Sequence, residues 1–311
     1  MMPAVGALSG RDFLDVADLG AAELRELLDL AHAIKDGRWS GRPLEGRHVA
    51  LLFQKPSHRT RVSFEVGIGR LGGRATNLTE QDVQLGVRET VGDAARVLDS
   101  YVDGVVARLR SHADLLELAA ASENPVINAL TSRSHPCQIL ADLMTLEEAC
   151  GPLARQKVAC IGDGNNIAVS LMEASELMGF SLTVITPPGH TPPAGDVDGN
   201  LQADDGGSAV ILSTDVADVA GATAIYTDVW ASMGQESERE VRREAFAGYQ
   251  VNQALMDAAP GAVFMHCLPA HRGEEVTDEV IDSPRSVVFQ QAGNRLHTQM
   301  ALMAQLFGAP S

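Results

Sequence analysis

The chain has 311 residues, of which 45% are hydrophobic, and it carries a formal net charge of −17 at pH 7. This length allows a large buried core and predicts about two domains. The negative charge repels nucleic-acid phosphates and anionic lipid headgroups, so it excludes functions that depend on binding nucleic acid or a membrane surface.

The sequence predicts a cytoplasmic protein. The first regular element that it predicts is a helix. Residues 1–15 lack the basic region and apolar run of a signal peptide, and no stretch approaches the roughly 18 apolar residues of a membrane span. Apolar residues recur at helical spacing over residues 21–35, and Gly37 is suited to ending that helix.

Short apolar runs then alternate with helical patterns. VALLF at residues 49–53 is typical of a strand buried on both faces, and the pattern after Thr60 is helical as far as Gly72. Strands that alternate with helices predict an α/β fold with parallel sheets. The other candidate strands are residues 102–107, 157–162, 181–186, 224–229 and 262–268.

Two series of strands and helices predict two domains. A helical pattern covers residues 136–150, and the strand-helix series starts again near residue 157. We therefore predict α/β domains at 1–150 and 151–293, each with a central parallel sheet flanked by helices. Residues 187–207 are rich in proline, glycine and aspartate, which predicts a surface excursion of the second domain.

Polar residues gather directly after several of the predicted strands. In parallel sheets, ligands bind at the carboxyl ends of the strands, so this placement points to a binding site. The segments concerned are 57–61, 108, 163–166, 228–234 and 267–272.

The first of these segments has the layout of an anion site. KPSHRTRVSFE at residues 55–65 joins a strand to a helix, and a helix N-terminus offers free backbone N–H groups. Ser57 and Thr60 add hydroxyl groups, and the Arg59 guanidinium can bind two phosphate oxygens at once. The alternative is that Ser57 caps the helix and the arginines form surface ion pairs.

Two other kinds of site fit the sequence poorly. The four cysteines form no CxxC pair and no zinc-ligand spacing, so we predict neither a disulfide framework nor a metal site. GDGNNIA at residues 162–168 follows a strand, as a dinucleotide fingerprint does, but Ile167 stands where the third glycine is needed. We therefore expect no cofactor.

The polar segments together resemble the motifs of the aspartate/ornithine carbamoyltransferase superfamily. SHRTR is similar to its Ser-Thr-Arg-Thr-Arg signature, with His58 in place of the usual threonine. The resemblance covers nearly the whole chain and implies one domain for carbamoyl phosphate, one for the amino substrate, and a homotrimer with shared active sites. The further motifs, in family order, are QLGVRET (84–90), Arg108, HPCQILADL (135–143), GDGNN (162–166), DVWASMG (228–234), HCLP (266–269) and NRLH (294–297).

The resemblance implies a carbamoyl phosphate site in the first domain. His58 contributes either its backbone N–H or an imidazole that attracts the phosphate, and Gln84 belongs to a loop that reaches a neighbouring subunit. Arg295 brings the C-terminal helix, residues 294–311, back to the first domain. The implied carbamoyl phosphate residues are Ser57, His58, Arg59, Thr60, Gln84, Arg108, His135, Gln138, Cys267, Leu268 and Arg295.

Catalysis of carbamoyl transfer is expected to rest on positioning and charge stabilisation. An amine attacks the carbonyl carbon, an oxyanion forms and phosphate leaves. Arg108, Thr60 and His135 are the expected donors to the carbonyl oxygen, and Gln138, one helical turn after His135, is expected to bind the carbamoyl nitrogen. The implied catalytic residues are Arg108, His135, Thr60, Cys267 and Asp228.

The second domain is expected to bind L-ornithine. By resemblance to ornithine-specific members, Asp228 contacts the α-ammonium group and Asn166 the α-carboxylate, while Asn165 is the weaker candidate for the carboxylate. Cys267 lies beside the reacting amine, or alternatively it is only a small buried residue after an apolar run. The implied ornithine-binding residues are Asn166, Asp228, Ser232 and Met233.

The resemblance thus implies transfer of the carbamoyl group to the side-chain amine of L-ornithine, giving L-citrulline and phosphate in arginine metabolism. Two alternatives stay open. A putrescine carbamoyltransferase would share HCLP and much of GEEVTDEVID at residues 273–282, but it would depart at the Ser-Met-Gly that this chain keeps. A catalytically inactive paralogue that binds carbamoyl phosphate would explain His58.

Overall fold

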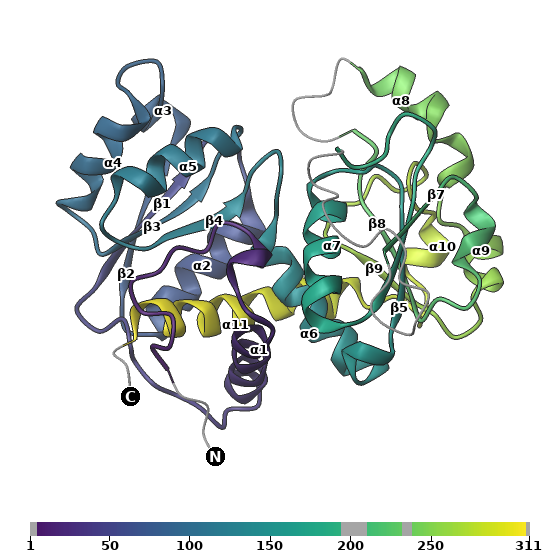
Figure 1. The fold of residues 1–311 in the computed structure, drawn as a ribbon, viewed down its shortest axis with the longest axis horizontal. Coiled ribbons are helices and arrows are strands. Elements are labelled where there is room, and N and C mark those ends of the chain that lie inside the picture. Colours follow the sequence, from purple (N-terminus) through teal and green to yellow (C-terminus); the bar gives the residue numbers. More distant parts are fainter. Residues whose placement is uncertain (1–4, 194–209, 232–237, 309–311) are drawn as a thin grey trace. The chain divides into compact units, whose positions relative to one another are not determined.

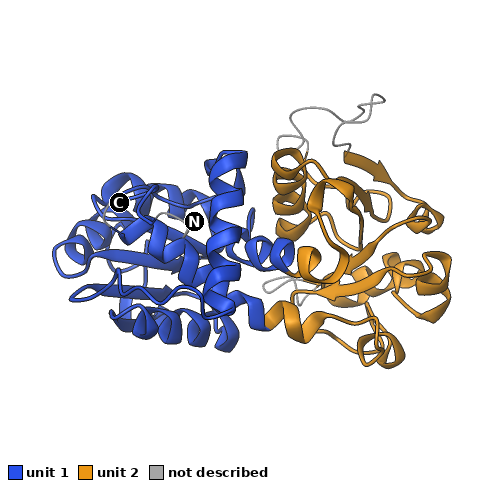
Figure 2. Ribbon diagram, turned by 90° about the horizontal axis from the view of Figure 1, so that it is seen from below, with its two compact units in different colours: residues 1–144, 293–311 blue, residues 145–292 orange. Residues whose placement is uncertain are grey.

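The computed structural model describes residues 5–193, 210–231 and 238–308. They divide into two compact units, Met1–Met144 with Gly293–Ser311 and Thr145–Ala292, whereas the sequence placed the boundary after residue 150 (Figures 1 and 2). Each unit has a parallel sheet flanked by helices, which confirms the predicted fold class.

The sheet of unit 1 has four parallel strands in the order β2-β1-β3-β4. Every residue of β1 except His48 is buried, because this strand lies inside the sheet and both of its faces are covered. The strands are β1 (His48–Phe53), β2 (Arg74–Thr79), β3 (Gly104–Arg108) and β4 (Val126–Leu130).

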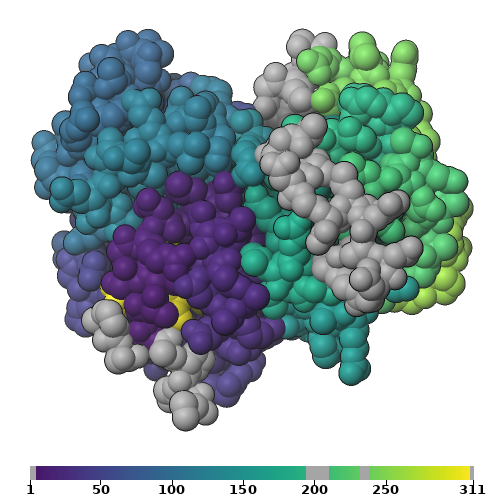
Figure 3. Space-filling model, in the orientation of Figure 1, coloured from purple at the N-terminus to yellow at the C-terminus, as the bar shows by residue number. Residues whose placement is uncertain are grey.

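Helices α4 and α5 pack on one face of this sheet, where Ala50, Val105 and Leu115 belong to one buried cluster. Helix α2 closely approaches α11, since a Cβ atom at Gly67 would lie 3.1 Å from Met303 Cε. In the view of Figure 3, other residues cover most of α11, and only a small yellow part of it is visible next to the purple N-terminal residues. The helices of this part of the chain are α1 (Ala21–Lys35), α2 (His58–Arg70), α3 (Glu80–Val83), α4 (Val91–Asp99), α5 (His112–Ala121), α6 (Pro136–Cys150) and α11 (Val288–Phe307).

The sheet of unit 2 has five parallel strands in the order β7-β6-β5-β8-β9. Its strands are β5 (Lys157–Ile161), β6 (Ser181–Ile185), β7 (Val210–Ser213), β8 (Ala224–Thr227) and β9 (Val263–His266). Its further helices are α7 (Asn166–Met178), α8 (Arg239–Ala245), α9 (Gln253–Ala258) and α10 (Asp278–Ile281).

Each sheet has one point where the strand order reverses. From β1 the chain of unit 1 moves to β2 on one side and later to β3 on the other, and unit 2 does the same around β5 and β8. Open α/β sheets bind ligands at such points, beyond the carboxyl ends of the two strands. The predicted site residues that follow β1, β3, β5 and β8 therefore stand at the two places where this topology favours binding.

The six strands predicted from apolar runs are all present, each within a few residues of its expected bounds. Strands β2, β4 and β7 were not predicted. Of the predicted excursion, residues 194–207 lie outside the described residues. Among the residues that the structure describes, no helix is both long and apolar enough to span a membrane.

Candidate active site

The predicted anion-binding turn forms the start of α2. Ser57 precedes the helix with extended backbone, φ −157° and ψ 100°, and its side chain makes no capping hydrogen bond. The alternative that its hydroxyl serves as a helix cap is therefore not observed. Thr60 is 2% exposed, Arg59 is partly buried, and His58 is exposed with Nε2 at 3.5 Å from Arg59 Nη1.

Arg108 and Arg110 have different environments although they are two residues apart. Arg108 ends β3 opposite Phe53 and is only 6% exposed. Arg110 is exposed and forms an ion pair with Glu80 through both of its terminal nitrogens, at 2.9 Å for Nη2 to Oε2. The structure therefore places Arg108 at the strand end and Arg110 at the surface.

Arg295 links two other predicted residues inside unit 1, Gln138 and Thr60. Its Nη1 donates to Gln138 Oε1 at 2.5 Å and its Nη2 donates to Thr60 Oγ1 at 3.2 Å. Gln138 Nε2 in turn donates to Asp142 Oδ1 at 2.8 Å, which fixes the orientation of the amide. These side chains are almost completely buried, so the network holds them in one arrangement.

His135 is kept neutral by its burial and by the charges of Arg295 and Arg108. Burial, followed by the positive charges of Arg295 and Arg108, lowers the pKa of His135 well below its ordinary value of 6.5. At neutral pH the imidazole therefore carries one N–H group and no charge. The result is a buried positive site of two guanidinium groups in a chain whose net charge is −17.

The neutral state of His135 predicts a loss of stability in mild acid. The unfolded chain binds a proton here with the ordinary pKa of 6.5, whereas the folded protein does not, so lowering the pH below that value favours unfolding. One such group contributes up to about 1.4 kcal/mol per pH unit. Urea unfolding between about pH 7.5 and about pH 5.5 measures the slope, which we expect to be smaller in His135→Gln. Equal slopes in both proteins would contradict a neutral His135.

Gln84 is not part of this buried group. It ends α3 in the left-handed conformation, with φ 44°, and its side chain is exposed. Among the hydrogen bonds of the described part of unit 1, none joins the Gln84 side chain to Thr60 or Arg295.

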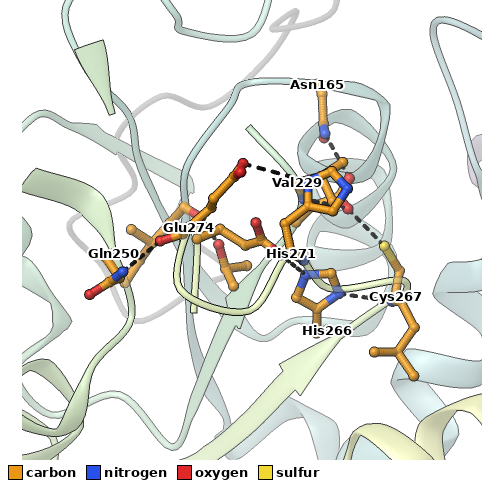
Figure 4. A network of polar contacts seen from close by, with 12 residues as sticks. Asn165, Val229, Gln250, His266, Cys267, His271 and Glu274 are labelled. Atoms are coloured by element: carbon orange, nitrogen blue, oxygen red, sulfur yellow. Dashed lines mark hydrogen bonds and ion pairs between the residues drawn. The ribbon is translucent and has the colours of Figure 1, made fainter. Parts of the chain in front are cut away.

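In unit 2, strand register brings Asp228 and Cys267 together. Thr227 of β8 is paired with His266 of β9, so the residues that follow them lie side by side. Cys267 Sγ donates to Asp228 Oδ1 at 3.0 Å, and the Val229 N–H donates to the same oxygen at 2.8 Å (Figure 4). The two predicted residues thus share one hydrogen-bonded group.

The two asparagines of GDGNN have different positions. Asn165 precedes α7, and its Oδ1 accepts from the Ile167 N–H at 2.9 Å while its Nδ2 donates to Asp228 Oδ2 at 2.8 Å. Both ends of that amide are therefore used within the protein. Asn166 is the first residue of α7 and, like Asn165, is partly exposed.

His266 and Glu275 support the HCLP loop and were not predicted as site residues. Both are 0% exposed, and His266 Nε2 lies 3.2 Å from Glu275 Oε1 (Figure 4). Because His266 Nδ1 accepts from the Leu268 N–H at 2.8 Å, its proton is on Nε2. Leu268 has φ 56°, a conformation that costs of order 1–3 kcal/mol, and this hydrogen bond offsets part of the cost. The HCLP motif begins with His266, so the motif was the sequence signal that could have identified this residue.

Two groups of described residues could offer three ligand atoms to a metal ion within 4.8 Å of one another. In the first, the Cys267 thiol and the His266 ring already form hydrogen bonds with other protein groups. The groups are Asp228 with His266 and Cys267, and His271 with Glu274 and Glu275. The predicted ornithine residues Ser232 and Met233 lie outside the described residues.

Comparison with known proteins places both units in one family. Residues 11–148 match the "Aspartate/ornithine carbamoyltransferase, carbamoyl-P binding domain" and residues 154–306 match the "Asp/Orn binding domain" of the same family. The chain is 51% identical over 310 residues to the ornithine carbamoyltransferase of Thermococcus kodakarensis, covering 98% of both chains. It is 50% identical over 310 residues to the ornithine carbamoyltransferase, anabolic, of Pyrococcus furiosus, again covering 98% of both.

Solved structures agree with these relatives. The ornithine carbamoyltransferase from Pyrococcus furiosus has a TM-score of 0.93 and 48% identity, covering 99% of this chain and 100% of its own. The ornithine carbamoyltransferase from Thermus thermophilus has a TM-score of 0.85 and 44% identity, covering 94% of this chain and 97% of its own.

Proposed function

The chain belongs to the aspartate/ornithine carbamoyltransferase family, and we propose that it transfers the carbamoyl group of carbamoyl phosphate to the side-chain amine of L-ornithine. The products are L-citrulline and phosphate. The observation that carries this proposal is the buried site formed by Arg108, His135 and Arg295, which suits an anion in a protein of net charge −17.

In the proposed reaction, unit 1 binds carbamoyl phosphate. The start of α2 offers backbone N–H groups, the Ser57 hydroxyl and the Arg59 guanidinium to the phosphate, with His58 contributing through its backbone. Thr60 and Arg295 lie beside them in the same network. This set of groups neutralises the phosphate and so favours its departure.

The carbamoyl group is held by the groups at the ends of β3 and β4. Arg108, Thr60 and neutral His135 donate to the carbonyl oxygen, where negative charge develops as the amine attacks. Gln138 Oε1 accepts from Arg295 with one of its two lone pairs, so the other can accept from the carbamoyl nitrogen. Cys267 and the Leu268 carbonyl complete this set in the proposal.

Unit 2 binds the acceptor and explains the choice of an α-amino acid. The Asp228 carboxylate attracts the α-ammonium group, and the Asn166 side chain donates to the α-carboxylate, with Ser232 and Met233 completing the set. The side-chain amine must lose a proton before its lone pair can attack, because an alkylamine has a pKa near 10.4. Asp228 and Cys267 are the groups that position it. The carbon–nitrogen bond forms, the bond from carbon to the phosphate oxygen breaks, and phosphate leaves with the electron pair and takes up the proton that the attacking nitrogen loses.

We also propose a homotrimer in the cytoplasm in which Gln84 serves a neighbouring subunit. Gln84 is exposed and stands apart from the buried network of its own unit, which fits a residue that acts on another copy. The relative from Pyrococcus furiosus is named anabolic, which supports a role in making citrulline for arginine.

Citrulline formation tests the proposal. The purified protein, given carbamoyl phosphate and L-ornithine, is expected to release citrulline and phosphate in equal amounts, and neither in the absence of ornithine. No citrulline at an enzyme concentration close to that of the substrates would contradict the activity. Calorimetric binding of carbamoyl phosphate in that case would indicate the inactive paralogue.

A further inference from the structure

Arg242 of α8 is a buried arginine that the sequence did not single out. Its residue exposure is 9%, whereas Arg243 beside it is exposed. The segment EREVRREAF contains two other arginines and three glutamates, and only its helical spacing from Glu238 distinguishes Arg242 from Arg239 and Arg243 in the sequence. Only the folded structure shows what this guanidinium contacts.

The guanidinium of Arg242 joins the segments that follow β5 and β8. Its Nη1 donates to Asp163 Oδ2 at 2.9 Å and to the Trp230 carbonyl at 2.8 Å, and its Nε donates to Glu238 Oε2 at 3.2 Å. Asp163 belongs to GDGNN and Trp230 to the segment that begins at Asp228. One buried side chain therefore ties together the two segments that carry Asn166 and Asp228.

Aromatic packing holds this connection in place. The Arg242 guanidinium lies 5.9 Å from the centre of the Phe246 ring, and the Trp230 ring stacks on Phe246 with centroids 5.9 Å apart. His190 meets Phe246 edge-on at 4.6 Å. Asp163 needs this arginine, since burial raises the pKa of its carboxyl group while the charge of Arg242 lowers it.

We infer that Arg242 is a positioning residue of the amino-acid site, which sets the separation between Asp228 and Asn166. This inference rests on the proposed function, in which those two residues bind the α-ammonium and α-carboxylate groups of one amino acid. The α-ammonium and α-carboxylate groups are attached to one carbon atom, so the distance between them is fixed. If Asp228 and Asn166 moved apart, the amino acid could not contact both residues well, and its binding would weaken. It would leave the carbamoyl phosphate residues of unit 1 unaffected.

The test compares Arg242→Gln, Arg242→Lys and the matched control Arg243→Gln in the full-length protein. For Arg242→Gln we expect the KM for ornithine to rise about 10- to 100-fold and the KM for carbamoyl phosphate to change less than about twofold. Arg242→Lys should show a smaller rise in the KM for ornithine. Its ammonium group can keep the contact with Asp163, but it cannot also reproduce the guanidinium hydrogen bonds to the Trp230 carbonyl and to Glu238. Arg243→Gln should match the wild type.

L-norvaline separates positioning from the chemistry. It has the α groups of ornithine without the reacting amine, so its inhibition constant should rise by the same factor as the KM for ornithine. An ornithine KM within twofold of that of Arg243→Gln, or equal rises in both KM values, would overturn the inference. Should Arg242→Gln fail to fold, the same comparison in Arg242→Lys decides. A wild-type protein that forms no citrulline would instead overturn the proposed function.

Discussion

Replacing Arg108 with glutamine is expected to lower kcat about 10²–10³-fold, the usual cost of removing one donor to a developing oxyanion. Arg108 is buried at the end of β3 and is one of two arginines whose charge reaches His135. A neutral amide in its place loses the charge that the proposal directs at the carbonyl oxygen. Steady-state kinetics at saturating carbamoyl phosphate and ornithine measures the effect.

Arg110→Gln is the matched control for this prediction. It lies two residues away and pairs with Glu80 at the surface, where a single ion pair contributes little to stability. We expect its kcat to stay within about twofold of the wild type. If Arg108→Gln retained nearly full kcat, or if both variants lost it equally, Arg108 would not act on the carbonyl group.

Replacing Asp228 with asparagine is expected to raise the KM for ornithine by roughly 30-fold or more while leaving the affinity for carbamoyl phosphate nearly intact. Truncating one partner of a buried charged hydrogen bond costs about 2 kcal/mol or more, which corresponds to this factor. The substitution also disturbs the hydrogen bond between Asn165 and residue 228. Asn165 Nδ2 donates to Asp228 Oδ2, and in the variant the amide nitrogen of the new asparagine can occupy the position of that oxygen, where it cannot accept.

Two measurements check the prediction for Asp228. Initial rates give the KM for ornithine, and calorimetry gives the affinity for carbamoyl phosphate. Asp257→Asn, an exposed aspartate on α9 in the same unit, serves as control and should leave both values unchanged. A Kd for carbamoyl phosphate that rises as much as the KM for ornithine would speak against Asp228 as an amino-acid contact.

The fold could be predicted wherever a strand is a continuous apolar run. Strand β2, RATNLT, is polar and largely exposed because it lies at the edge of its sheet, so its sequence has no apolar signal. Strand β4, VINAL, contains Asn128, which is completely buried and whose Nδ2 donates to the Leu14 carbonyl at 2.7 Å. Burial of this amide depends on a tertiary contact that local sequence does not show.

The motifs predicted which residues follow which strands, but not how side chains share partners. The sequence named Thr60, Gln138 and Arg295 separately, and their direct hydrogen bonds follow from α11 packing beside α2. Strand register then explains why Asp228 meets Cys267. Arg242 could not be predicted, because a buried and an exposed arginine look alike in a charged helix.

In the proposed function the acceptor is ornithine, an α-amino acid with a side-chain amine. The most direct measurement offers the enzyme carbamoyl phosphate with an equimolar mixture of L-ornithine, putrescine, L-lysine and L-aspartate, and identifies the carbamoylated products by mass spectrometry. We expect citrulline to be the dominant product at early times, because only ornithine combines the α groups with an amine of the right reach. Carbamoylputrescine or carbamoylaspartate as the main product would contradict the claim.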